Sequence, residues 1–167
     1  TLIRPVSGLV IDLSDPDALS WFSPEGNGIS YFLTIVDTLG SKALRIKMKD
    51  KVTYGGIWFQ LPTELNLQES SLVSYEVFSV EKKTWHWNYF YDAHGTDGDI
   101  NRNIQNSVNH QFAANAGVWT DLLFDYRDPG DMNNSSGVPI DGGRINAILL
   151  NMHDTKPTWP FTDATAT

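Results

Sequence analysis

The chain has 167 residues, with 20 acidic and 12 basic side chains, a net charge of −8 and no cysteine. Its length favours a single domain. The absence of cysteine excludes disulfides, thiolate metal sites and cysteine nucleophiles, and the acidic excess argues against a nucleic-acid partner, which needs a basic surface. No apolar run is long enough for a membrane span. What remains to be explained is the aromatic content, with 6 Trp, 6 Tyr and 8 Phe.

Short segments of alternating apolar and polar residues recur along the chain and predict β-strands. In chain order, the predicted strands are residues 9–13, 29–36, 43–49, 56–61, 71–80, 84–92, 118–126 and 144–153. Turn-rich segments separate them, and residues 15–20 predict one short helical turn capped by Asp15. Short strands at this spacing predict an all-β fold, an antiparallel β-sandwich or barrel.

Residues 1–154 show no internal repeat and no domain boundary, so we expect one β-sandwich domain there. Residues 155–167 (TKPTWPFTDATAT) are rich in Thr and Pro, and we expect a tail, a linker or the approach to a final strand. The chain starts at Thr1 without a signal peptide. We therefore expect a mature or excised part of a longer, multidomain protein, in which this domain is monomeric.

The alternation places tryptophan on strand faces that otherwise carry polar residues. Trp58 shares a face with Gln60, and Trp119 shares one with Asp121, whereas Ile57, Phe59, Leu122 and Phe124 point the other way. A tryptophan on a polar sheet face is informative, because large apolar side chains on such faces mark interaction sites. These rings are therefore the first candidates for binding a ligand.

The residue types on these faces predict carbohydrate binding. An aromatic ring stacks on the apolar C–H face of a pyranose, while planar polar side chains bind its hydroxyl groups. The predicted carbohydrate-binding residues are Trp58, Gln60, Glu76, Trp85, Trp87, Trp119, Asn151 and His153. For Trp85 and Trp87 a place in the core stays open, because Phe90 occupies the other face of their strand. If Arg45 and Lys47 line the binding face, an acidic sugar becomes the expected ligand.

Two other classes of function stay open. A β-sandwich glycoside hydrolase needs two carboxylates across a cleft, for which Glu76 with Asp121 or Asp125 are candidates. A polysaccharide lyase would use a tyrosine and a histidine as base and acid. The candidates for that role are Tyr89, Tyr91, His86 and His153. A structural or adhesion domain of a cell-surface protein would need no sugar site.

Three segments carry a resemblance to a known family: GSKAL at residues 40–44, GVWTDLLFDY at 117–126 and RINAILL at 144–150. With the order of the predicted strands, they resemble the β-jelly-roll carbohydrate-binding modules, galactose-binding-like domains of secreted bacterial polysaccharide-degrading enzymes. The resemblance implies a jelly roll and a secreted or cell-surface location. It also implies a non-catalytic module that brings an appended enzyme to its polysaccharide or oligosaccharide.

The resemblance also implies a structural calcium ion, which is held near the loops after the first strand. By position Asp12 and Asp37 match the calcium ligands, with backbone carbonyls near Lys42. Asp163 is the nearest candidate for the acidic residue that closes this site. In such modules sugar binds in a groove on one sheet or at the loops. The groove would hold Trp58, Gln60, Trp87, Trp119 and Asn151.

Overall fold

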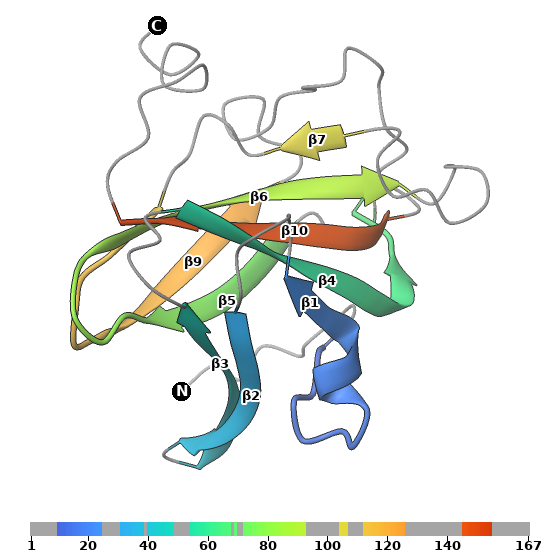
Figure 1. Cartoon of the computed structure of the whole chain (residues 1–167). Helices are drawn as coiled ribbons and strands as arrows, with labels where there is room; N and C mark the ends of the chain where they lie inside the picture. Colours follow the sequence, from blue (N-terminus) through green and yellow to red (C-terminus); the bar gives the residue numbers. More distant parts are fainter. Residues whose placement is uncertain are drawn as a thin grey trace, which may run out of the picture.

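The computed structural model describes residues 10–24, 31–38, 40–48, 54–67, 69, 72–92, 104–106, 112–125 and 145–154. Its elements, drawn in Figure 1, are the 3₁₀-helix η1 (Ala18–Trp21) and the strands β1 (Phe22–Pro24), β2 (Tyr31–Thr38), β3 (Ser41–Met48), β4 (Tyr54–Leu65), β5 (Leu72–Phe78), β6 (Thr84–Asp92), β7 (Ile104–Asn106), β8 (Phe112–Ala114), β9 (Trp119–Asp125) and β10 (Ile145–His153). Within these ranges no helix has the length and apolar character of a membrane span.

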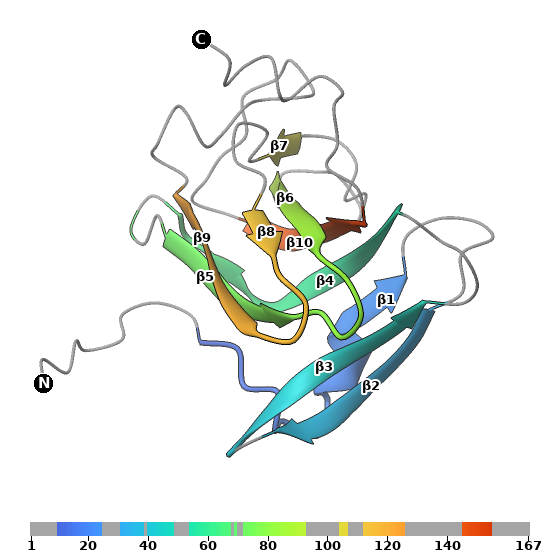
Figure 2. The ribbon, with the colours of Figure 1, turned by 90° about the vertical axis from the view of Figure 1, so that its left-hand side faces the viewer.

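The described strands form an antiparallel β-sandwich, as predicted. The largest sheet has the order β1-β4-β10-β6-β7, with β8 also paired to β6, while β2-β3 and β5-β9 form separate pairs. One face of the large sheet packs against β5–β9: the Tyr75 hydroxyl donates a 2.7 Å hydrogen bond to Asn88 Oδ1, and the Phe112 and Phe124 rings meet edge to face at 4.8 Å. Figure 2 shows β5 and β9 together on one side of that sheet, with the β2–β3 hairpin beyond β1.

The predicted strands from residue 29 onward are confirmed, with shifted ends. The predicted strand 9–13 is wrong in its described part, residues 10–13. There the Asp12 carboxylate accepts hydrogen bonds from the backbone N–H (2.9 Å) and hydroxyl (2.7 Å) of Ser14 and closes a turn. The helical turn at 15–20 is confirmed but begins later, at Ala18, and the predicted cap is wrong, because Asp17 rather than Asp15 stands at the N-cap. Strands β1, β7 and β8 were not predicted, because three residues are too few to show alternation.

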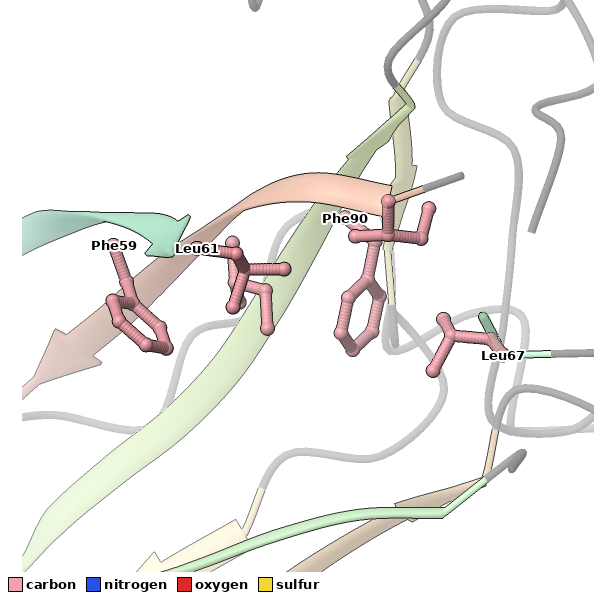
Figure 3. Packing of buried hydrophobic residues seen from close by; sticks show 6 residues of the cluster. Phe59, Leu61, Leu67 and Phe90 are labelled. Atoms are coloured by element: carbon pink, nitrogen blue, oxygen red, sulfur yellow. The ribbon is translucent and has the colours of Figure 1, made fainter. Parts of the chain in front are cut away.

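The largest buried cluster lies on the inward face of the large sheet, and smaller ones, around Trp87 and around Tyr91, Ala147 and Leu149, lie on its other face. Phe59, Leu61, Phe90, Ile145 and Ile148 form one buried cluster with Leu67. Figure 3 shows Phe59, Leu61 and Phe90 on the same side of the sheet, with Leu67 beside Phe90. Trp21, Phe22 and Val73 pack against this cluster. Because side chains alternate along a strand, the inward residues of β4, β6 and β10 determine which residues of these strands lie on the opposite, outward face.

His86 is the buried titratable side chain of the inward face. It is 6% exposed, its Nε2 lies 2.8 Å from Thr84 Oγ1, and burial lowers its pKa from 6.5 to about 4. Between pH 4 and pH 6.5, His86 is therefore protonated in the unfolded chain and neutral in the folded chain. The stabilising effect of a neutral His86 is complete above pH 6.5 and is lost as the pH falls toward 4.

We therefore expect the free energy of unfolding to fall by roughly 3 kcal/mol across this window because of His86 alone. Urea unfolding at several pH values would measure it, with His86→Gln as the matched variant. The variant is less stable at neutral pH, since it repacks a buried site, but its stability should vary less between pH 6.5 and 4. Parallel pH profiles for the two proteins would contradict this prediction.

Candidate functional site

The outward face of the large sheet gathers most of the predicted sugar-binding residues. Strands β4, β10 and β6 pair in one register, so their outward residues form rows across the sheet. We call this surface the Trp58 face. Its rows are Gln60–Ala147–Tyr91, Trp58–Leu149–Tyr89, Gly56–Asn151–Trp87 and His153–Trp85. The structure thus brings together Trp58, Gln60, Trp85, Trp87, Asn151 and His153.

The aromatic rings of the Trp58 face differ in exposure. Trp58, Trp85 and Tyr89 are half-buried, so part of each ring meets solvent. The Trp58 and Tyr91 rings lie 4.9 Å apart at 60°, a tilted contact that packs the indole against Tyr91. The Lys83 ammonium lies 5.3 Å from the centre of the Trp85 ring and covers part of it. Trp58 and Tyr89 are therefore the rings best placed to stack on a ligand.

Trp87 does not present its ring to a ligand. Its exposed fraction is 0%, and it packs against Tyr89. The sequence left open whether Trp87 packs in the core or binds a sugar. Its burial favours the core. Alternation alone could not decide this, because the Trp58 face is itself partly buried.

Asn151 is the most unusual polar residue of this face. It is 1% exposed, and neither its Oδ1 nor its Nδ2 has a hydrogen-bond partner within the described ranges. It stands beside Gly56, which adds no side chain, and beside Trp87. An unpaired buried amide is costly, so a donor and an acceptor from a ligand or an ordered water would stabilise it.

The other two polar residues of the Trp58 face have partners. Gln60 is exposed, and its Nε2 donates a 2.9 Å hydrogen bond to the backbone carbonyl of Asn146. His153 is half-buried, with Nδ1 3.7 Å from the Asp154 carboxylate. Gln60 lies two rows from Asn151, and His153 lies one row from it on the other side, so polar groups lie on both sides of the row that contains Trp58 and Tyr89.

Trp119 and Glu76 lie elsewhere, and the predicted single groove for Trp58 and Trp119 is wrong. Both residues are on the outward face of β5–β9. The inward faces of the two sheets pack on each other, so Trp58 and Trp119 stand on opposite sides of the sandwich. Strand phase correctly indicated that both point outward, but it does not say to which sheet a strand belongs.

The candidate catalytic residues of a hydrolase lie on β5–β9, and those of a lyase lie on β6 and β10. Glu76 is directly opposite Asp121 across β5–β9, and a hydrogen bond with that carboxyl group, together with its repulsion, raises the pKa of Glu76. Both side chains are exposed on a sheet face rather than set across a cleft. For a lyase, His86 is on the inward face whereas Tyr89, Tyr91 and His153 are on the outward one. The Asp125 side chain is outside the described part.

Two of the predicted calcium ligands line one cavity. Asp12 and Asp37 border a cavity of about 650 Å³ together with Ser14, Thr38, Ser41 and Lys42. Hydrogen bonds from Ser14 lower the pKa of Asp12, and Asp37 forms an ion pair with Lys42. Gly40, at φ +84°, makes the turn between β2 and β3 at this cavity. Asp163 is outside the described residues.

The oxygen donors of this cavity suit a hard cation, but their number is small. Calcium takes six to eight oxygen ligands, and no group of three acidic or histidine side chains is found within the described ranges. Hydroxyl groups and backbone carbonyls would have to supply the rest. The Lys42 ammonium would also have to leave Asp37.

Comparison with known proteins gives matches of structure alone. No protein-family model matches the chain, and no curated protein does. The family 11 carbohydrate-binding module of a cellulosomal cellulase from Clostridium thermocellum superposes with a TM-score of 0.57 at 13% identity, covering 90% of this chain and 94% of that module. An agarase matches with a TM-score of 0.56 at 14% identity, and an exo-β-agarase with 0.55 at 14%.

The two agarases are much longer than this chain. The matches cover 87% and 94% of this chain but only 22% and 26% of the agarase chains. The matched unit is therefore one part of each agarase and nearly the whole of the cellulase module. This chain thus has the antiparallel β-sandwich fold of carbohydrate-binding modules of polysaccharide-degrading enzymes, as the sequence resemblance implied.

Proposed function

We propose that the chain is a non-catalytic carbohydrate-binding module that holds an attached enzyme on its polysaccharide, outside the cell or at its surface. The observation that carries the proposal is the Trp58 face, where the half-buried rings of Trp58, Tyr89 and Trp85 lie in the rows on either side of Asn151, whose amide has no hydrogen-bond partner among the described residues. Trp58 would stack on the C–H face of a sugar ring. Gln60 and His153 would bind its hydroxyl groups directly, and the Asn151 amide, which is buried, would reach them through a bridging water.

The ligand that this face favours is a neutral polysaccharide. Arg45 and Lys47, which would have indicated an acidic sugar, are exposed on β3 in a separate sheet. The cross-strand neighbours of Trp58 are Leu149 and Ser23, and its ring contacts Tyr91, so none of them carries a charge. A carboxylate or sulfate on the sugar would find no guanidinium there among the described residues, and the Lys83 ammonium is placed over the Trp85 ring rather than beside Trp58. Agarose and hydroxyethylcellulose, both neutral, are therefore suitable probes.

Trp58→Ala should weaken binding to whichever probe the chain retains by on the order of tenfold or more, because loss of a central stacking ring removes a dominant contact. Affinity electrophoresis in gels that contain agarose or hydroxyethylcellulose would measure this. Phe32→Ala, which removes an exposed ring from β2, is the matched control and should bind normally. Binding that survives Trp58→Ala unchanged would refute the role of this face.

The same samples separate the alternatives. A binding module releases no reducing sugar from either polysaccharide, so turnover by the purified chain would favour a β-sandwich hydrolase or lyase. Retention of neither probe, by a chain that is folded, would favour a structural or adhesion domain.

We also propose that calcium binds at the cavity of Asp12 and Asp37. Millimolar calcium should then raise the melting temperature, and a chelator should reverse the rise, because a ligand that binds only the folded state stabilises it. Asp37→Ala should abolish this response, whereas Glu81→Gln, a change of an exposed carboxylate elsewhere, should preserve it. An unchanged melting temperature with calcium and with chelator would argue against the site.

A further inference from the structure

The outward face of β5–β9 carries more apolar surface than a solvated sheet face requires. Its cross-strand pairs are Ser74–Leu123, Glu76–Asp121 and Phe78–Trp119, with Leu72 at the end of β5. We call this surface the Trp119 face. The exposed fractions are 49% for Trp119, 42% for Phe78, 55% for Leu72 and 50% for Leu123. Four large apolar side chains on one outward face mark a binding surface rather than a solvated one.

The arrangement of this face suits a sugar. The Phe78 and Trp119 rings lie 5.4 Å apart at 50°, so the two rings present differently oriented surfaces side by side. The next pair along the same face is Glu76–Asp121, two residues away on each strand, about 7 Å. That is close to the width of one pyranose unit. A sugar stacked on Trp119 would therefore hold its hydroxyl groups beside two carboxylates, which accept hydrogen bonds.

The two carboxylates also indicate what kind of molecule binds to the Trp119 face. A purely apolar protein surface would bury Glu76 and Asp121 with no partner except each other, which is costly for two acidic groups. A polyol brings apolar C–H groups for the rings and hydroxyl donors for both carboxylates at once. The hydrogen bond between the two carboxyl groups and their mutual repulsion, which raise the pKa of Glu76, are both relieved when each carboxylate accepts a separate hydroxyl donor.

We infer that the Trp119 face is a second glycan-binding surface, on the opposite side of the sandwich from the Trp58 face. One chain would then bridge two polysaccharide strands, because packed core separates the two faces and one short oligosaccharide cannot reach both. The bridging rests on the proposed function of the Trp58 face. Binding at the Trp119 face does not depend on it.

The test is a titration of the chain with agaro-oligosaccharides and with cello-oligosaccharides, together with turbidity measurements on dissolved agarose and hydroxyethylcellulose. The proteins are the native chain, Trp58→Ala, Trp119→Ala, the double variant and Phe32→Ala. We expect two sites in the native chain and in Phe32→Ala, one in each single tryptophan variant and none in the double variant. Turbidity from cross-linked polysaccharide should vanish in both single variants.

The outcomes distinguish the two proposals. If Trp119→Ala keeps the native stoichiometry and turbidity, the second surface is refuted and the Trp58 face can still stand. If Trp119→Ala removes all binding while Trp58→Ala removes none, the Trp58 proposal fails and so does the bridging. Asp121→Asn, which keeps the shape of the face, should weaken only the second site, on the order of tenfold. A normal second site in Asp121→Asn would refute the role of the carboxylate pair. Unchanged circular dichroism confirms that each variant is folded.

Discussion

Replacing Trp87 by alanine should lower the free energy of unfolding by roughly 3–5 kcal/mol, the range for truncating a large buried aromatic residue. Trp87 is 0% exposed, so its removal leaves a cavity on the Trp58 face rather than a trimmed surface. Many domains have a total stability of about 5–15 kcal/mol, so the variant would be marginal at room temperature. Urea unfolding of the native chain and of the variant would measure the loss.

Trp87→Phe separates packing from ligand binding. Phenylalanine keeps most of the buried ring, so this variant should lose much less stability than Trp87→Ala. If Trp87 serves only to pack, Trp87→Phe should retain the probe polysaccharide almost as well as the native chain. A Trp87→Phe protein that is stable but no longer binds the polysaccharide would instead show that Trp87 contacts the ligand. Trp58→Ala, at a half-buried ring, should show the reverse pattern, a small loss of stability and a large loss of binding.

The strands could be predicted from the sequence because their side chains alternate over seven or more residues, as in β5 and β6. Their inward and outward faces followed from the same pattern: Phe59 points into the core and Trp58 away from it. The failures lie where local hydrogen bonds compete with strand pairing. Asp12 accepts hydrogen bonds from Ser14 and turns the chain, although the residues around it are apolar enough for a strand.

The candidate site was only half predictable, for a different reason. Strand phase is a local property, whereas the assignment of a strand to a sheet depends on pairing between distant segments. Trp58 and Trp119 therefore looked equivalent in sequence, yet β4 pairs with β10 and β9 pairs with β5. The unpaired amide of Asn151 could not be foreseen either, because it depends on Gly56 and Trp87 as cross-strand neighbours.

Phe90→Ala should cost a similar roughly 3–5 kcal/mol, but through the inward core. Phe90 is 1% exposed and packs with Phe59, Leu61 and Leu67, so its loss opens a cavity between the sheet and the elements that cover it. Thermal or urea unfolding would measure the effect. Phe32→Ala deletes a ring of the same size that is 56% exposed on β2, and its cost should stay within about 0.5 kcal/mol.

The comparison also tests the phase of β6, on which the Trp58 face depends. Successive residues of a strand point to opposite sides, so Phe90 can lie in the core only if Tyr89 and Tyr91 point outward. A shift of the strand by one residue would exchange the two sets and turn Tyr89 and Tyr91 toward the inward cluster in place of Phe90. Equal, small losses for Phe90→Ala and Phe32→Ala would mean that Phe90 is not in the core. The aromatic rows of the Trp58 face would then be assigned to the wrong side of the sheet.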